Sequence, residues 1–257
     1  MSRFYSLRGD GPRHLVNAAA AFSYLHKRFG TTEINWKASR WIAVYPSLGL
    51  AYNRIQKNAN TSAMVLLRDL EQGDIEHQRT AKKTTLTLFD FGPRRKHIPQ
   101  DLTYFVIIRN PYSRVLSAFL NKFKPNSRIS KEHGAFDHTA DGFKKFVYYL
   151  RDGGRSGNSH WDLQKKLMLL PPDQYDRVIR FENFQEEMLG FLESRGLAPR
   201  AGSLEALYPS DQNKKTDATK KMERFYTREV ADLVADLFAA DFDTLGYDRT
   251  FPGTLED

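Results

Sequence analysis

The sequence predicts an α/β protein with a parallel sheet, because strand, loop and helix follow one another three times. The β-rich runs are Leu48–Ile55, Thr103–Ile108 and Arg177–Phe181, and each leads through a short loop into a helical stretch. The run at 103–108 (TYFVII) is a short apolar stretch of the kind that suits a parallel strand covered on both faces. Ligands of such sheets bind beyond the carboxyl ends of the strands, so we expect a site at these three loops.

The length of 257 residues fits one domain, and 40% hydrophobic with 13% aromatic residues supplies a core and excludes a disordered chain. We expect a single domain over residues 1–257. Its first part, residues 1–40, is expected to be an N-terminal helical extension with a helix over 12–29 that stops at Gly30. Residues 124–160 are rich in Gly, Ser, Lys and His, and we expect them to form an insertion over the site.

The net charge of +8 and the pI of about 9.5 predict an anionic partner. Nucleic acid, acidic glycan, anionic membrane and nucleotide phosphates all meet that requirement. The chain has no cysteine, which excludes disulfides, zinc–thiolate sites, iron–sulfur clusters and cysteine nucleophiles, and which fits a reducing compartment. The first residues carry no apolar signal core, and no run of about 18 apolar residues occurs, so we expect a cytoplasmic protein without a transmembrane segment.

The first candidate loop, residues 57–62 (KNANTS), lies between a predicted strand and a predicted helix. A helix N-terminus there offers unpaired N–H groups and a favourable dipole to an anion, and Lys57 adds a full charge. An ordinary helix start with a surface lysine is the alternative for this segment alone. The loop has no glycine and its lysine comes first, unlike the G-x-x-x-x-G-K-[ST] loop that holds a triphosphate. No acidic strand end that could hold magnesium is evident either.

The second candidate segment, residues 105–123 (FVIIRNPYSRVLSAFLNKF), is more specific. Arg109 lies at the end of a predicted strand, Asn110 can cap the following helix, and Pro111 suits its first turn. Ser117 follows two helical turns after Arg109, so a guanidinium and a hydroxyl can converge on one phosphate. A salt bridge at the strand end is the alternative for Arg109 taken alone.

These two segments resemble the donor-binding segments of sulfotransferases. KNANTS is similar to the family's 5′-phosphosulfate loop, and RNPYSRVLSAF is similar to its 3′-phosphate segment. Three later segments extend the resemblance to carbohydrate sulfotransferases of the chondroitin/dermatan 4-O type and their bacterial relatives. They are HWDLQKKL (160–167), YDRVIRFENFQEEM (175–188) and FYTREVADLVADLFAADFDTLGYD (225–248). The chain departs from the pattern at Gln56, where the family usually has proline. It also lacks the family's cysteines and membrane anchor, which suggests a bacterial-type, unanchored enzyme.

The resemblance implies a P-loop nucleotide-kinase-like, three-layer fold with a central parallel sheet. It also implies 3′-phosphoadenosine 5′-phosphosulfate as co-substrate, a carbohydrate or glycoconjugate acceptor and adenosine 3′,5′-bisphosphate as product. We expect no metal ion, because the transferred group and the leaving phosphate carry less charge than a triphosphate. Transferred residue by residue, the 5′ side of the donor would be held by Lys57, Asn58, Asn60, Thr61 and Ser62. The 3′-phosphate would be held by Arg109 and Ser117. The segment Asn213, Lys214 and Lys215 resembles a loop that closes over the nucleotide, although a solvated linker is equally compatible with its composition.

Sulfuryl transfer needs in-line geometry and stabilisation of charge on the leaving oxygen, and Lys57 is placed for the second task. The acceptor hydroxyl needs a general base. The candidates are His97, His160, and an acidic residue such as Asp90 or Glu182. An ATP-dependent small-molecule kinase, an inactive nucleotide-binding relative and a nucleic-acid-binding module are the alternative functions. The sequence predicts neither the acceptor's identity nor the oligomeric state.

Overall fold

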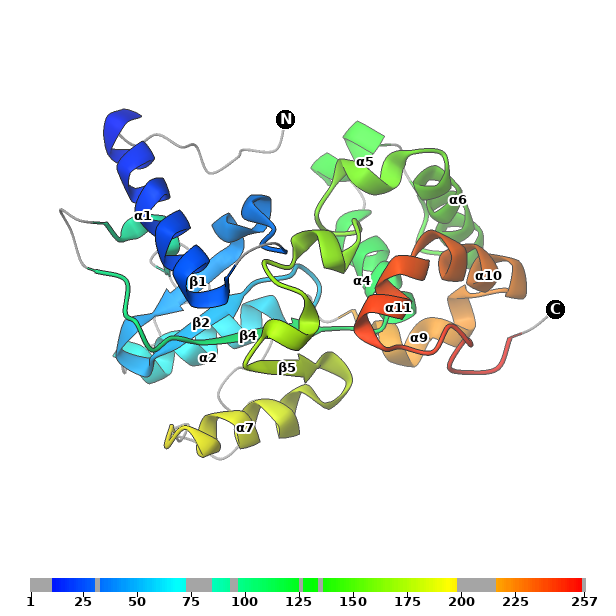
Figure 1. The fold of residues 1–257 in the computed structure, drawn as a ribbon. Helices are drawn as coiled ribbons and strands as arrows, with labels where there is room; N and C mark the ends of the chain where they lie inside the picture. The colour runs from blue at the N-terminus through cyan, green and yellow to red at the C-terminus, as the bar shows by residue number, and fades with distance from the viewer. Residues whose placement is uncertain are drawn as a thin grey trace.

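The computed structural model describes residues 11–30, 33–72, 85–92, 97–124, 127–133, 136–197 and 216–255. Its centre is a five-stranded sheet in the order β3-β1-β2-β4-β5 (Figure 1). The strands are β1 (Ile42–Tyr45), β2 (Leu50–Asn53), β3 (Leu86–Thr87), β4 (Thr103–Ile108) and β5 (Arg177–Arg180). The described helices are α1 (Gly11–Phe29), α2 (Asn60–Gln72), α4 (Pro111–Lys122), α5 (Arg128–His133), α6 (Ala140–Arg151), α7 (Phe184–Ser194), α9 (Ala218–Phe225), α10 (Arg228–Leu237) and α11 (Ala239–Leu245).

The predicted α/β fold is confirmed, and the three predicted units are those whose strands run parallel. β2 pairs with β4, and β4 with β5, in parallel register. The remaining edge is antiparallel, because β1 pairs with both β2 and β3 in the opposite direction. The chain reverses between β1 and β2 through a short 3₁₀ turn that ends at Gly49, which has the left-handed φ of 63° that glycine tolerates best. The sheet is therefore mixed, and its parallel strands β2, β4 and β5 are those followed by the loops at which we expect the site.

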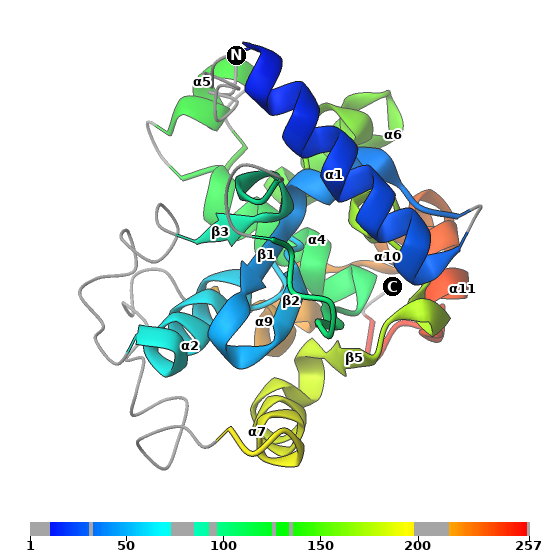
Figure 2. The same cartoon turned by 60° about the vertical axis from the view of Figure 1, so that its left-hand side comes forward.

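Helices cover both faces of the sheet, which gives three layers (Figures 1 and 2). Successive residues of β4 point to opposite faces. Tyr104 and Val106 join a core that includes Leu25 of α1, whereas Phe105 and Ile107 join a core built with α2 and α7. Helix α1 thus packs on one face of the sheet, and the expected single domain with residues 1–40 as its N-terminal helical part stays a prediction.

A third core lies beside the sheet, where α4, α6, α9, α10 and α11 gather (Figure 1). Phe143 and Phe146 of α6 are fully buried against Phe119 of α4. The region 124–160 therefore contributes α6 to the core, so it is more than an insertion over a site; whether its loops cover an acceptor stays a prediction. No helix among the described residues is long and apolar enough to cross a bilayer.

Candidate functional site

Three residues with charged side chains follow the carboxyl ends of the three parallel strands. Lys57 comes after β2, Arg109 directly after β4, and Glu182 after β5. The strand register sets Asn53 beside Val106 and Ile108 beside Arg180, so the three loops leave the same edge of the sheet. This is the edge at which parallel sheets bind ligands.

The loop after β2 holds a strained backbone. Lys57 has φ 74° and Ala59 has φ 51°, and with Asp217 at φ 46° they are the non-glycine residues with positive φ in the described chain. L-residues in this conformation cost on the order of 1–2 kcal/mol each, and such strain persists only where the surroundings fix the backbone. Helix α2 begins directly after Ala59. The strained turn therefore leads directly into the N-terminus of α2 at this edge of the sheet.

Asn58 holds this loop against the end of strand β4. Its side chain is fully buried, and Nδ2 donates to the carbonyl of Ile107 at 2.8 Å and to Oε1 of Gln164 at 2.6 Å. These amide N–H groups hold the loop against β4, and the expectation that Asn58 contacts the donor stays a prediction. The other predicted residues of the 5′ side are half-buried at the mouth of the loop: Lys57, Asn60, Thr61 and Ser62. Their contact with a donor stays a prediction.

Arg109 is a buried cation at the end of β4, with 4% of its surface exposed. Nε donates to the hydroxyl of Ser113 at 2.8 Å, Nη1 donates to the carbonyl of Lys57 at 2.9 Å, and the guanidinium lies 3.8 Å from the centre of the Phe181 ring. Burial lowers the pKa of Arg109 to about 9, although Glu182 opposes that shift. Among the described residues it forms no ion pair at contact distance. A buried guanidinium in this condition is stabilised by an anion that brings its own charge.

The hydroxyl that pairs with Arg109 in this structure is that of Ser113, which the sequence analysis missed. Ser113 lies one helical turn after Arg109, and Ser117 lies one turn further along the same face of α4. The hydroxyl of Ser117 lies 3.1 Å from that of Thr216, the residue that follows Lys215. The segment that follows the predicted nucleotide loop thus reaches the Ser117 surface. Lys214 and Lys215 themselves lie outside the described residues.

Arg114 is a second buried arginine, 1% exposed, and it joins segments that are far apart in the sequence. It donates to three carbonyls: from Nε to Gln56 at 3.2 Å, from Nη1 to Asp162 at 2.8 Å, and from Nη2 to Ser159 at 3.2 Å. Burial lowers the pKa of Arg114 to about 10, against the attraction of Asp241. Gln56 directly precedes Lys57 and Ser159 directly precedes His160, so one guanidinium holds the Lys57 loop and the His160 segment together.

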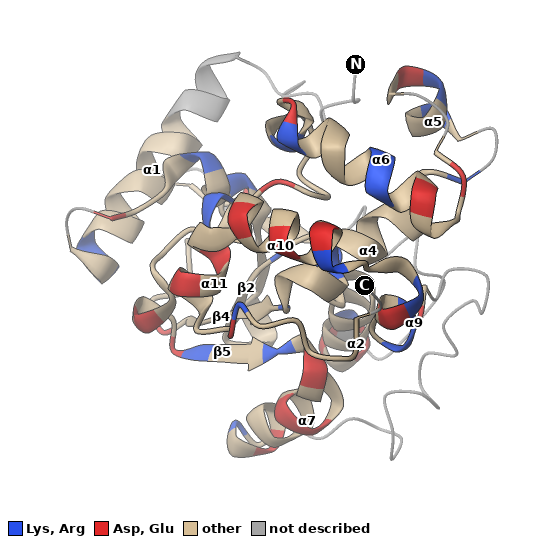
Figure 3. Cartoon of the chain, turned by 90° about the vertical axis from the view of Figure 1, so that its right-hand side faces the viewer, with Lys and Arg blue, Asp and Glu red and all other residues tan. Residues whose placement is uncertain are grey.

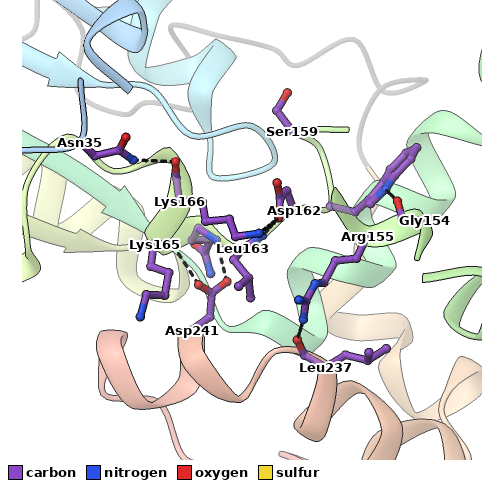
Figure 4. Close-up of polar contacts among 12 residues, drawn as sticks. Asn35, Gly154, Arg155, Ser159, Asp162, Leu163, Lys165, Lys166, Leu237 and Asp241 are labelled. Carbon is purple, nitrogen blue, oxygen red and sulfur yellow. Dashed lines mark hydrogen bonds and ion pairs between the residues drawn. The ribbon is translucent and has the colours of Figure 1, made fainter. Parts of the chain in front are cut away.

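Gln164 completes the connection between the strand ends. Its side chain is fully buried, donates to the carbonyl of Arg109 at 2.7 Å and accepts from the N–H of Arg109 at 3.0 Å. The buried carboxylate of Asp241 in turn accepts from the backbone N–H groups of Gln164 at 2.7 Å and Lys165 at 3.0 Å (Figure 4). Burial raises the pKa of Asp241, and the positive charge of Arg114 opposes that rise. This network fixes the backbone on both sides of Arg109.

The structure separates the two histidine candidates. His160 lies in the segment that Arg114 draws to the Lys57 loop, and its Nδ1 is 2.6 Å from Oδ1 of Asn158. His97 is exposed and precedes β4, so it lies on the approach to the opposite end of that strand from Arg109. The neighbouring Trp161 is fully buried and donates to the carbonyl of Gly154 at 2.9 Å, which anchors the His160 segment in the core.

The acidic candidates also differ. The carboxylate of Glu182 accepts from the N–H of Asn110 at 2.8 Å and from the hydroxyl of Tyr247 at 2.7 Å, beside Arg109. Asp90 instead accepts from the N–H and the hydroxyl of Thr87, and so caps a 3₁₀ turn at the β3 edge of the sheet. These hydrogen bonds give Asp90 a structural role at this turn, and its place among the candidate bases stays a prediction.

Comparison with known proteins identifies the family of the chain. The profile of the sulfotransferase family matches residues 41–248, which include the sheet and the strand-end residues described above. The chain belongs to the sulfotransferase family. Human carbohydrate sulfotransferase 9 is 28% identical to this sulfotransferase over 170 residues, which are 58% of the present chain and 38% of the human protein. The match thus spans well under half of that relative's length. No solved structure gives a significant match to the sulfotransferase described here.

Proposed function

We propose that this sulfotransferase moves a sulfuryl group from 3′-phosphoadenosine 5′-phosphosulfate to a hydroxyl of a carbohydrate or glycoconjugate by in-line displacement. The observation that carries the proposal is the pair of cationic positions at neighbouring strand ends. Arg109 is buried without a carboxylate partner at contact distance in the described chain, and Nη1 of Arg109 binds the carbonyl of Lys57 in the strained loop beside it. A donor with separate phosphates on its 3′ and 5′ sides supplies an anion to each.

Lys57 stabilises the charge that develops on the 5′-phosphate oxygen when the bond from that oxygen to sulfur breaks. In this proposal the N–H groups at the start of α2, which begins at Asn60, bind the same phosphate together with the hydroxyls of Thr61 and Ser62. Arg109 and Ser117 hold the 3′-phosphate, and Lys214 and Lys215 add charge from the segment that leads to Thr216. The transferred group and its leaving phosphate carry less charge than a triphosphate, so the proposed reaction needs no metal ion.

His160 acts as the general base in this proposal, in place of His97. The support is positional: Arg114 binds Ser159 and Gln56 with one guanidinium, so His160 and Lys57 belong to adjoining segments. The acceptor oxygen attacks sulfur from the side opposite the leaving oxygen, and its proton passes to His160. Adenosine 3′,5′-bisphosphate then leaves.

A carbohydrate acceptor is supported by the activity in the printed name of the human relative and by the net charge of +8, which suits an anionic glycan. Basic and acidic residues lie side by side on α6, α9 and α10 (Figure 3), where Lys144 pairs with Glu229 and Lys145 with Asp141. A nucleic-acid interface would instead gather positive charge on one face. That the enzyme acts in the cytoplasm stays a prediction.

Thermal melting separates this proposal from its alternatives. At adenosine 3′,5′-bisphosphate concentrations about 100 times Kd, ligand binding stabilises the fold by roughly 2.7 kcal/mol, which raises Tm by roughly 5–10 °C for a domain of this size. Arg109→Ala should abolish the shift. Arg249→Ala is the matched control, since Arg249 pairs with Asp243 on the surface. A shift with ATP and magnesium alone identifies a kinase and overturns the proposal.

Transfer itself is tested with the sulfur-labelled donor and a panel of desulfated glycans. Label in a glycan supports the full proposal. Binding of adenosine 3′,5′-bisphosphate without transfer to any glycan, peptide or small alcohol identifies an inactive nucleotide-binding relative.

A further inference from the structure

Within the described residues, the guanidinium of Arg109 is held at contact distance by neutral groups. Nε donates to the hydroxyl of Ser113 at 2.8 Å, Nη1 donates to the carbonyl of Lys57 at 2.9 Å, and the Phe181 ring centre lies 3.8 Å from the guanidinium carbon. A guanidinium has five N–H groups, and two of them are used in these bonds. The other three, including both on Nη2, have no hydrogen-bond partner in the described part of the chain.

Ser113 is built to accept from Nε. The residue is 1% exposed, and its hydroxyl also donates to the carbonyl of Asn110 at 3.2 Å. A serine hydroxyl has one proton and two lone pairs. Because the proton goes to Asn110, a lone pair is directed to the N–H of Arg109. Asn110 caps α4 and Ser113 lies in the first turn of that helix, so both partners of the hydroxyl are fixed by the backbone.

Glu182 is the charged group that competes for this guanidinium. Its carboxylate accepts from the N–H of Asn110 at 2.8 Å and from the hydroxyl of Tyr247 at 2.7 Å, and its charge acts on Arg109 without an ion pair at contact distance. A guanidinium turned toward Glu182 would be neutralised and would attract a ligand anion less. Such a turn would pull Nε away from Ser113 and leave a buried N–H without an acceptor, which is costly.

We propose that Ser113 is a positioning residue that holds Arg109 by Nε, so that the N–H groups of Nη2 meet the 3′-phosphate of the donor. The inference rests on the proposed sulfuryl transfer and adds a residue to its donor site. Because Ser113 occupies Nε, the phosphate binds to the outer nitrogens of the guanidinium. The side chain is already oriented before the ligand arrives, so little of its conformational freedom is lost on binding. Ser113 itself needs no contact with the ligand.

Binding is measured by calorimetry with adenosine 3′,5′-bisphosphate and with adenosine 5′-monophosphate, which lacks the 3′-phosphate. Ser113→Ala should weaken binding of the bisphosphate by on the order of 10-fold and binding of the monophosphate much less. Ser39→Ala is the matched control. Ser39 is buried and donates to a carbonyl three residues earlier, that of Trp36 at 2.6 Å, as Ser113 does, but it holds no arginine. Ser39→Ala should leave both affinities unchanged.

The orientation of Arg109 can be read without any ligand, from the Nε–H signals in ¹H–¹⁵N NMR spectra of arginine-labelled protein. The signal of Arg109 is assigned by its absence from an Arg109→Lys variant. In the wild type this N–H should exchange slowly with solvent, because it is buried and bonded to Ser113. Ser113→Ala should shift the signal and speed its exchange, and Ser39→Ala should do neither.

Kinetics separate positioning for binding from a role in the chemical step. Transfer of labelled sulfate to desulfated chondroitin, used as the probe acceptor, should show a raised donor KM in Ser113→Ala with kcat unchanged. This is the pattern of an interaction made equally in the ground state and the transition state. The 3′-phosphate is remote from the bond that breaks, so the pattern follows from the proposal.

The inference is overturned if Ser113→Ala binds the bisphosphate as tightly as the wild type, or loses equal affinity for both ligands. An Arg109 signal that is the same in Ser113→Ala and the wild type overturns it too. In each of these cases sulfuryl transfer stands, provided that Arg109→Ala still abolishes binding of the bisphosphate. A wild type that neither binds adenosine 3′,5′-bisphosphate nor transfers sulfate overturns the proposed function itself, and with it the ligand that Ser113 serves.

Discussion

Replacing Arg114 with methionine tests whether one buried guanidinium holds the Lys57 loop and the His160 segment together. Methionine fills much of the same volume but cannot donate, so the carbonyls of Gln56, Ser159 and Asp162 lose their charged partner. Hydrogen bonds to charged groups contribute about 1.5–3 kcal/mol each, and bonds within one network are not additive. Removing one partner of a buried charge network typically costs about 3–5 kcal/mol.

We therefore expect Arg114→Met to lower the free energy of unfolding by about 3–5 kcal/mol. Urea unfolding at pH 7 measures it, as a lower midpoint at unchanged m-value. The matched control is Arg249→Met, which breaks a half-exposed pair with Asp243 and should cost less than about 1 kcal/mol. If both variants lose equally little stability, Arg114 is not the clamp that the geometry indicates.

The same variant has a pH dependence whose sign follows from Asp241. Burial already raises the pKa of this carboxyl group, and Arg114 opposes the rise, so its loss raises the pKa further. A group whose folded pKa is raised adds stability below its unfolded pKa, and that contribution is lost as pH rises through the folded pKa. The deficit of Arg114→Met should therefore grow from acidic to neutral pH. Adding Asp241→Asn removes the titrating charge, so the stability deficit of the double variant should no longer depend on pH. If the deficit stays equally pH-dependent, Asp241 is not its source.

Three further outcomes follow from the site. Lys57→Ala should lower the rate of labelled sulfate transfer by on the order of 10²-fold or more, and a near-normal rate removes Lys57 from the reaction. Arg109→Lys keeps the charge but loses the fork that meets Ser113 and the carbonyl of Lys57, so calorimetry should show weaker binding of adenosine 3′,5′-bisphosphate by about 10-fold or more; equal affinity would mean that charge alone suffices. Ser117→Ala should weaken the same ligand by about 1–3 kcal/mol without affecting affinity for adenosine 5′-monophosphate, which lacks the 3′-phosphate, and equal losses for both ligands contradict the 3′ assignment.

The unit β4–α4 could be predicted almost to the residue because its signals are local. The apolar run ends at Ile108, the side chain of Asn110 accepts from the N–H of Tyr112, and Pro111 takes the first turn, as the sequence analysis expected. The β1–β2 hairpin could not be predicted in the same way. A proline and a serine between two β-rich runs indicate a break, but whether the chain reverses there is decided by pairing with β3 and β4.

The residues of the candidate site also differ in whether local sequence signals could identify them. Lys57 and Arg109 could be found because both follow strands, and Ser113 could have been found from its helical spacing to Arg109. Arg114 and Gln164 could not, since their contacts join segments that are tens of residues apart. The sequence does not single out Asn158, and only the hydrogen-bond geometry shows that its side chain meets that of His160.

The positive φ angles of Lys57 and Ala59 affect how much the loop around Lys57 must rearrange when a ligand binds. A glycine-rich phosphate loop samples many backbone shapes when empty, and its ligand must select one of them. Lys57 and Ala59 have side chains that narrow those shapes, and Asn58 holds the loop to β4 before any ligand arrives. Little conformational entropy is then left to lose on binding, so affinity reflects contacts more directly. The same rigidity prevents the loop from adapting to a ligand. A ligand whose anionic group does not reach the N–H groups of the loop therefore gains no affinity from them.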